Sequence, residues 1–265
     1  HRTQVLNELK STGEFLTPVH SFGHVAVSGI TRYRSHALDR NWDDHWFTTF
    51  FNSGKVVRLS LERQGATYAA TQHEFLTSPS REFHPTDVLE DADGSLLVID
   101  TGGWFYKGCP TSQYAKPDVL GGIYRIRRDT AVTISDPRGL QIEWDALQPY
   151  ALVKLLSDSR FAVRERAVSE CEQRGAYVLE PLADTLTTGD VLARTNCVWA
   201  LTRLLQQAEL AEAASRALRP ALSDAVADVR QAACHGFGRA DCHLETAWIV
   251  PLLSDAEPAV RRQAA

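Results

Sequence analysis

The spacing of hydrophobic residues changes once along the chain, near residue 130. Before that point the apolar residues form short runs rich in aromatic and β-branched side chains, such as WFTTFF, KVVRLSL, SLLVID and GIYRIR. Glycine, asparagine, aspartate or proline separates the runs, which is typical of strands joined by turns. The pattern therefore predicts an antiparallel β region within residues 1–130.

One turn in this region contains several carboxylates. In VLEDADGSLLVID, Asp93 and Gly94 lie between two strand-like runs, where a tight turn needs positive φ. Asp91, Asp93 and Gly94 also resemble part of a calcium loop, but such a loop needs a glutamate about six residues after the glycine. The residues after Gly94 are SLLVID, so the sequence favours a hairpin.

After a polar connector, residues 131–149, the period becomes about 3.6 residues and a repeat begins. LVKLLSDSRFAVRERA, LRPALSDAVADVRQAA and IVPLLSDAEPAVRRQAA share Leu-Ser-Asp, four residues, then Val-Arg. LADTLTTGDVLARTNC keeps the spacing, with Thr188 at the aspartate position. A single helix pair cannot bury its apolar face alone, so about four pairs should stack over residues 150–265, the last one truncated.

This repeat register resembles short HEAT-like repeats, which stack as an α-solenoid. The resemblance implies a charge ladder between units, with an arginine early in each second helix and an aspartate in each turn. The residues of this ladder are Arg164, Arg194, Arg230 and Arg261 with Asp158, Asp224 and Asp255. Because Thr188 replaces the aspartate of the second unit, we expect Arg194 to lack that partner.

The strand runs group into about two blade-like units of the length found in β-propellers. HSFGHVAVSGITRYR, FFNSGKVVRLSLE, FHPTDVLEDADGSLLVIDTGG and GGIYRIRR resemble the last blades of a quinoprotein glucose/sorbosone dehydrogenase-like propeller. The whole chain is similar to large bacterial proteins that join such a propeller to HEAT repeats and a c-type haem domain. The expected fold class is therefore β + α multidomain: a partial antiparallel β-propeller followed by an α-solenoid of HEAT-like helix pairs.

That resemblance implies a dehydrogenase that oxidises a sugar or an alcohol with pyrroloquinoline quinone (PQQ) and passes electrons to a cytochrome. PQQ with calcium would belong to the intact parent, and a c-type haem to a downstream domain. The family places arginines before the strand that begins with DV, and REFHPTDV makes Arg81, His84 and Asp87 the cofactor-binding candidates. The family's catalytic histidine lies in an earlier blade, so no catalytic residue is assigned and the isolated chain should be inactive and bind no cofactor.

A second hypothesis is a non-catalytic binding module, in which the blades and the solenoid recognise a glycan or a protein. Loops at strand ends often carry ligand sites. Four residues of such loops are candidates to face a ligand, with turn capping as the alternative role: His20, His24, Asp100 and Trp104. No metal site is predicted, because the His-x3-His spacing of His20 and His24 aligns two imidazoles only on a helix.

The composition and the net charge restrict the classes of partner that we expect. The chain has 265 residues, 44% of them hydrophobic and 23% charged, and a net charge of −5 without a Lys/Arg block. Nucleic acid and anionic membranes are therefore disfavoured, while a protein could bind the solenoid. No apolar run approaches the ~20 residues that span a bilayer. By resemblance the parent would be periplasmic or exported. The start lacks Met, and the end falls inside a repeat, so we expect a fragment.

The five cysteines form no dense framework. Four of them, Cys171, Cys197, Cys234 and Cys242, fall in helical patterns, where a small buried thiol is ordinary. The remaining one, Cys109, could be a structural or disulfide-bonded residue or a reactive thiol. Cys234 and Cys242 are too far apart in sequence for a typical zinc pair, and no Cys-x-x-Cys-His haem motif occurs.

Overall fold

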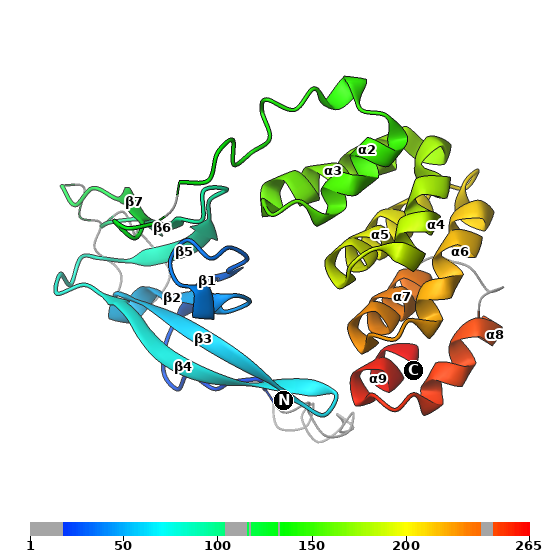
Figure 1. The fold of residues 1–265 in the computed structure, drawn as a ribbon. Helices are drawn as coiled ribbons and strands as arrows, with labels where there is room; N and C mark the ends of the chain where they lie inside the picture. The colour runs from blue at the N-terminus through cyan, green and yellow to red at the C-terminus, as the bar shows by residue number, and fades with distance from the viewer. Residues whose placement is uncertain (1–17, 104–115, 117, 132, 240–245) are drawn as a thin grey trace, which may run out of the picture.

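The computed structural model describes residues 18–103, 116, 118–131, 133–239 and 246–265. The chain has two parts, two antiparallel sheets and a stack of helices, so its fold is mixed β + α (Figure 1). Trp104, Cys109 and Cys242 lie outside the described residues.

The first sheet is a four-stranded meander in which neighbouring strands follow one another in sequence. Its β3–β4 hairpin turns at Gly65, whose φ is +59°. Two short 3-10 helices, η1 (Arg40–Trp42) and η2 (Phe51–Ser53), flank the second strand. The strands are β1 (Val27–Arg32), β2 (Trp46–Phe50), β3 (Lys55–Gln64) and β4 (Thr67–Thr77).

The second sheet is a three-stranded meander of β5 (Pro85–Glu90), β6 (Leu96–Asp100) and β7 (Gly122–Ile126). The predicted turn between β5 and β6 is confirmed. Gly94 has φ of +80°, and the amide of Asp91 donates to the carbonyl of Ser95 at 2.8 Å.

The two sheets pack closely, with β1 beside β5. Their shared core contains Tyr33, Phe47, Val56, Val88, Leu96 and Val98. At the closest approach, a Cβ on Gly29 would lie 2.1 Å from Asp87 Oδ1 and 2.5 Å from the Asp87 Cα. Only glycine fits there. The register of β1 and β2 also shifts between Val27 and Ile30, around this glycine.

The helices follow one another in pairs. One short 3-10 helix, η3 (Trp144–Ala146), precedes the first of them. Others form turns between helices: η4 (Leu155–Ser157), η5 (Gly175–Val178), η6 (Arg219–Ser223) and η8 (Val250–Ser254). The helices are α2 (Pro149–Lys154), α3 (Phe161–Arg174), α4 (Leu179–Thr188), α5 (Val191–Leu204), α6 (Ala211–Leu218), α7 (Ala227–Arg239), α8 (Thr246–Ile249) and α9 (Pro258–Ala264).

The second helices of successive pairs, α3, α5, α7 and α9, pack in order against one another (Figure 1). One apolar core runs through the stack. The valines of the repeat register, Val163, Val229 and Val260, are fully buried, as the period predicts. Among the described residues, no helix is both long and apolar enough to cross a bilayer.

Among the described residues, polar contacts join the sheets and the helices at two places. At one, Arg34, which follows β1, forms an ion pair with Glu165 of α3. At the other, the tip of the β3–β4 hairpin meets the last helices, where Arg63 pairs with Asp228 and Arg262 Nη1 donates to the carbonyl of Ala66 at 3.0 Å. A cleft lies between the two parts.

Candidate binding cleft

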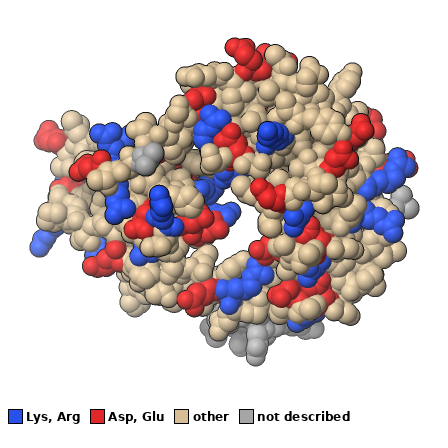
Figure 2. Space-filling model, viewed as in Figure 1, with Lys and Arg blue, Asp and Glu red and all other residues tan. Residues whose placement is uncertain are grey.

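The cleft has a volume of about 1470 Å³, and residues of both parts line it. Figure 2 shows the molecule hollowed between the sheets and the helices, with basic and acidic side chains around the opening. The charged lining residues are Arg32, Arg34, Arg40, Arg160, Arg164 and Arg203 with Asp43, Asp44, Asp158 and Glu165. Arginines therefore outnumber carboxylates on the cleft walls.

The end of β1 and the turn after it form the sheet wall. Here Arg34 connects the two parts, because its guanidinium lies 4.1 Å from the centre of the Phe161 ring and pairs with Glu165. A guanidinium above an aromatic face is attracted by the ring quadrupole. The contact places the first turn of α3 opposite the sheet wall.

The helical wall comes from α3 and α5. Asn196 Nδ2 donates to the carbonyl of Leu156 at 2.7 Å, which ties the two helix pairs together. Arg203 pairs with Glu172 at 2.9 Å. Trp199 is 37% exposed in the cleft, and its ring packs edge-on against His235 at 5.7 Å. The wall thus offers a fixed, partly exposed aromatic surface between polar groups.

The arginines of the repeat register bind the turns between helix pairs. Arg194 reaches forward to the next repeat, where Nε and Nη2 donate to Asp224 at 2.8 and 3.1 Å. Arg230 does the same to Asp255, with both distances 2.8 Å. Each pair is bidentate, the strongest geometry for arginine and carboxylate. The hydrogen bond that Arg230 donates to Asp255 raises the pKa of Arg230.

The remaining contact of each ladder arginine is with its own turn. Arg230 Nη1 donates to the carbonyl of Asp224 at 2.8 Å, and Arg261 Nη1 donates to that of Asp255 at 2.6 Å. Arg230 therefore binds the backbone carbonyl of the aspartate in its own repeat and the side-chain carboxylate of the aspartate in the following repeat.

Thr188 affects the pairing of Arg164 and not, as expected, the pairing of Arg194. Because carboxylates come from the following repeat, Thr188 deprives Arg164 of its partner, while Arg194 keeps Asp224. Arg164 Nη1 donates to the carbonyls of Asp158 and Ser159 at 2.6 and 3.1 Å. It forms no ion pair with any described residue. Burial, and next the charge of Arg34, lower the pKa of Arg164.

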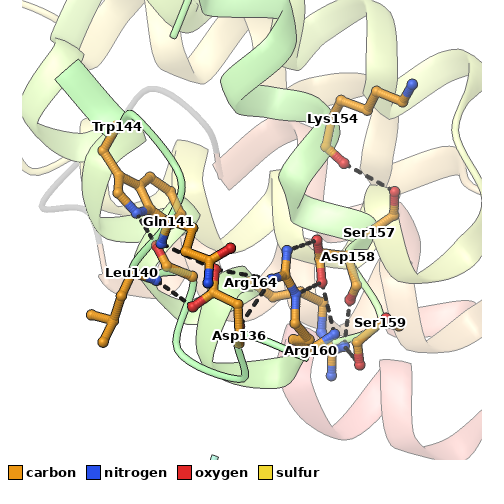
Figure 3. A network of polar contacts seen from close by, with 11 residues as sticks. Asp136, Leu140, Gln141, Trp144, Lys154, Ser157, Asp158, Ser159, Arg160 and Arg164 are labelled. Atoms are coloured by element: carbon orange, nitrogen blue, oxygen red, sulfur yellow. Dashed lines mark hydrogen bonds and ion pairs between the residues drawn. The ribbon is translucent and has the colours of Figure 1, made fainter. Parts of the chain in front are cut away.

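Asp158 also differs from the expected pairing, because its carboxylate binds Arg160 rather than Arg164. Arg160 Nε and Nη2 donate to Asp158 at 2.9 and 2.8 Å, and Nη1 donates to the carbonyl of Asp136 at 2.9 Å. In Figure 3, Arg160 lies between Asp136 of the connector and Asp158. This network fixes the connector to the first helix pair beside the cleft, and the hydrogen bond from Arg160 lowers the pKa of Asp158.

A buried carboxyl lies behind the sheet wall. The Glu90 side chain is fully buried, and its Oε2 accepts from the amide of Arg34 at 2.9 Å and from its Nε at 3.4 Å. Its Oε1 and the hydroxyl of Ser35, which lines the cleft, form no hydrogen bond to described residues. Burial raises the pKa of Glu90, against the opposing effect of the hydrogen bonds and charge of Arg34.

The three quinone-site candidates do not line this cleft. Arg81 is exposed in the turn before β5. His84 Nδ1 lies 3.1 Å from the carbonyl of Gly102, and Asp87 Oδ1 accepts from the amide of Val88 at 2.8 Å. The side chains of His84 and Asp87 thus bind nearby backbone groups. No contact joins Arg81 to either of them among the described residues.

The four candidates for ligand-facing residues differ in burial and in their contacts. Asp100 is buried, and its Oδ1 accepts from the amides of His84 and Gly102 at 3.0 and 2.9 Å, so it shapes the turn. His20 Nδ1 lies 3.0 Å from the carbonyl of Ala70. His24 is exposed. Trp104 falls outside the described residues.

Residues with metal-binding chemistry have other roles in the part that the structure describes. Asp91 pairs with Arg125 at 2.8 Å and with Arg138, and Asp93 pairs with Arg125 at 3.2 Å. Cys171, Cys197 and Cys234 are buried free thiols, and burial raises the pKa of Cys171 to about 12. No group of three or more His, Cys, Asp or Glu suited to a metal occurs among the described residues.

In comparisons with known proteins, no family model matches the chain and no curated protein matches it. The site is therefore interpreted from its own geometry. Sequence reasoning did not single out Arg34, Glu165 or Trp199. The first two are 131 positions apart, and nothing in their local sequence indicates that they meet.

Proposed function

We propose that this chain is a protein-binding module whose cleft receives a segment of a partner protein. The observation that carries this proposal is the cleft itself, lined by both parts of the chain and by more arginines than carboxylates. An excess of positive charge in a concave site attracts a negatively charged segment. Interfaces are enriched in arginine and aromatic residues, and Arg203 and Trp199 lie together on the helical wall.

The fold part of the proposal is that the sheets are consecutive propeller blades and that the helices form a HEAT-like solenoid. Two features support it: each sheet is an antiparallel meander with β1 beside β5, and the second helices pack in sequence order. In this proposal Trp199 belongs to the concave side of the solenoid, where such repeats bind partners.

A parent quinoprotein-type dehydrogenase is a further proposal, which rests on the sequence resemblance. It includes the PQQ, calcium and cytochrome partners and a periplasmic or exported location. Arg81, His84 and Asp87 do not fit a shared quinone site, because His84 and Asp87 bind backbone groups and Arg81 is exposed. We derive no catalytic step from them. Fluorescence titration of the chain with PQQ and calcium should show no submicromolar binding.

The binding proposal can be tested by selecting peptides on the immobilised chain from a displayed random library. Selected peptides should lose at least about tenfold in affinity for Trp199→Ala, because the exposed ring would be a contact residue. Tyr177→Ala is the matched control, since Tyr177 is 80% exposed and does not line the cleft. Peptides that bind Trp199→Ala as tightly as the wild type would contradict the proposal, and binding on a glycan array instead would favour a glycan ligand.

A further inference from the structure

The ladder shows how this fold holds a carboxylate. At Arg194 and Arg230, Nη1 binds a carbonyl of the arginine's own turn, while Nε and Nη2 bind an aspartate of the next repeat. Both aspartates also accept a backbone amide two residues later, which orients them. The guanidinium fork is thus held by its own turn and presented to a carboxylate carried on a protein loop.

Arg164 is held in the same way without the carboxylate. Its Nη1 binds the turn at Asp158 and Ser159, whereas its Nε and Nη2 have no acceptor among the described residues. The cause lies in the second repeat, where α4 continues through Thr188 and the Thr188 hydroxyl donates to the carbonyl of Asp184 at 2.9 Å. The other turns end in a 3-10 helix followed by an extended aspartate, as at Asp224.

Arg164 lines the cleft together with Phe161 and Leu192. The charges that act on it come from both walls: Arg34, Asp158, Glu165 and Asp43. Glu165 is paired with Arg34, and Asp158 is paired with Arg160. Asp43 lies on the far wall and forms no ion pair with a described residue. The nearby carboxylates therefore do not occupy the fork of Arg164.

We propose that Arg164 recognises an aspartate side chain of the partner protein, which takes the place that Asp224 and Asp255 occupy at the other two arginines. This inference rests on the proposed binding function of the cleft and names the chemistry of its partner. A peptide segment fits better than a free anion, because the two occupied forks hold aspartates of protein loops. The cleft also has room for several residues, and apolar Leu192 and Trp199 line it as well.

The test uses a probe taken from the chain itself. The hexapeptide LSDAVA, residues 222–227, carries the aspartate that fills the fork of Arg194. With both ends blocked it has one carboxylate, and LSNAVA is the matched peptide without the charge. Binding to the chain is followed by NMR at the Nε–H signal of Arg164 and at the indole N–H of Trp199.

We expect LSDAVA to shift the Arg164 signal and to bind about tenfold more tightly than LSNAVA, the usual worth of a charge-assisted bidentate contact. In Arg164→Lys the charge remains but the planar fork is lost, so the preference for LSDAVA should become smaller. Arg40→Ala is the control, because it removes one positive charge from a different position in the cleft. In this variant the preference for LSDAVA should persist.

Equal binding of the two peptides, an undiminished preference in Arg164→Lys, or no shift at Arg164 up to about 10 mM peptide would overturn the proposal. The pattern of shifts separates it from the proposed function. If the peptides shift the Trp199 signal but not the Arg164 signal, the cleft remains a binding site and only the proposed role of Arg164 is contradicted. Shifts confined to residues outside the cleft would contradict both.

Discussion

The sheets and the helices of this chain are held together by different means. Between the sheets, backbone lies against backbone at Gly29 and Asp87, with no space for even a methyl group. Between helix pairs, buried valines contribute to the core, and Arg194 and Arg230 each bind an aspartate of the next pair. The close approach of the two sheets therefore requires one glycine, whereas the helix packing repeats a polar contact that can be occupied or empty.

The largest effect should come from the close contact of the sheets. Gly29→Ala places a Cβ against the backbone of Asp87, so the sheets must move apart, and overpacking of this kind costs about 3 kcal/mol. Urea unfolding followed by circular dichroism measures the free energy of unfolding. Gly238→Ala is the matched control, because a Cβ there meets no atom within 4 Å. Equal stability of the two variants would contradict the description of the sheet contact.

The next effect tests an occupied position of the ladder. Arg230→Ala leaves Asp255 without its partner, and both side chains are largely buried, at 15% and 10% exposed. The free energy of unfolding should fall by about 1 to 3 kcal/mol, the range for a lost hydrogen bond to a charged group. A loss below about 0.5 kcal/mol would place this pair with solvent-exposed salt bridges instead.

Arg164→Ala should cost less than Arg230→Ala, because no carboxylate is left unpaired. It removes two hydrogen bonds to the carbonyls of Asp158 and Ser159, and we expect a loss of about 0.5 to 1.5 kcal/mol. The same urea experiment measures both variants. If the two losses were equal, or if Arg164→Ala cost more, the distinction between an empty and an occupied position would not hold.

The smallest effects concern pH, and they have opposite signs in the two parts. Burial raises the pKa of Glu90, so the folded state holds its proton longer than the unfolded state and stability falls as the pH rises above about 4.3. The Arg230 hydrogen bond lowers the pKa of Asp255, so its contribution is present above about pH 3.9 and is lost as the pH falls.

Glu90→Gln should therefore reduce the fall in stability as the pH rises above about 4.3. Asp255→Asn should instead reduce the loss on acidification below pH about 4. Unfolding free energies measured across this range check both expectations. A Glu90→Gln profile parallel to that of the wild type would contradict the burial of an ionisable carboxyl behind the sheet wall.

Much of the local structure follows from the sequence. The alternation around Asp93 and Gly94 predicted the hairpin, because positive φ is needed at that point and glycine adopts it. The 3.6-residue period predicted that Val163, Val229 and Val260 would be buried, because residues at helical spacing share one face. The resemblance to a dehydrogenase propeller remains a prediction that neither the comparisons nor the fold tests.

The candidate site was predicted only in part. The repeat register identified Arg164, Arg194 and Arg230 as residues between helix pairs. It did not show which aspartate each arginine would reach, because the register offers Arg230 one aspartate in its own repeat, Asp224, and another in the next, Asp255. The observed direction, from Arg194 to Asp224, depends on how far one helix pair is displaced from the next.

The sequence by itself thus determined where strands and helices form, because these depend on side-chain periodicity and turn residues within a few positions of one another. Only the tertiary structure decided that Arg34 meets Glu165, that the Glu90 side chain is buried, and that Arg164 lines a cleft and has no carboxylate partner among the described residues. These contacts join residues far apart in the chain. Their geometry depends on the relative placement of whole sheets and helix pairs, which no local pattern encodes.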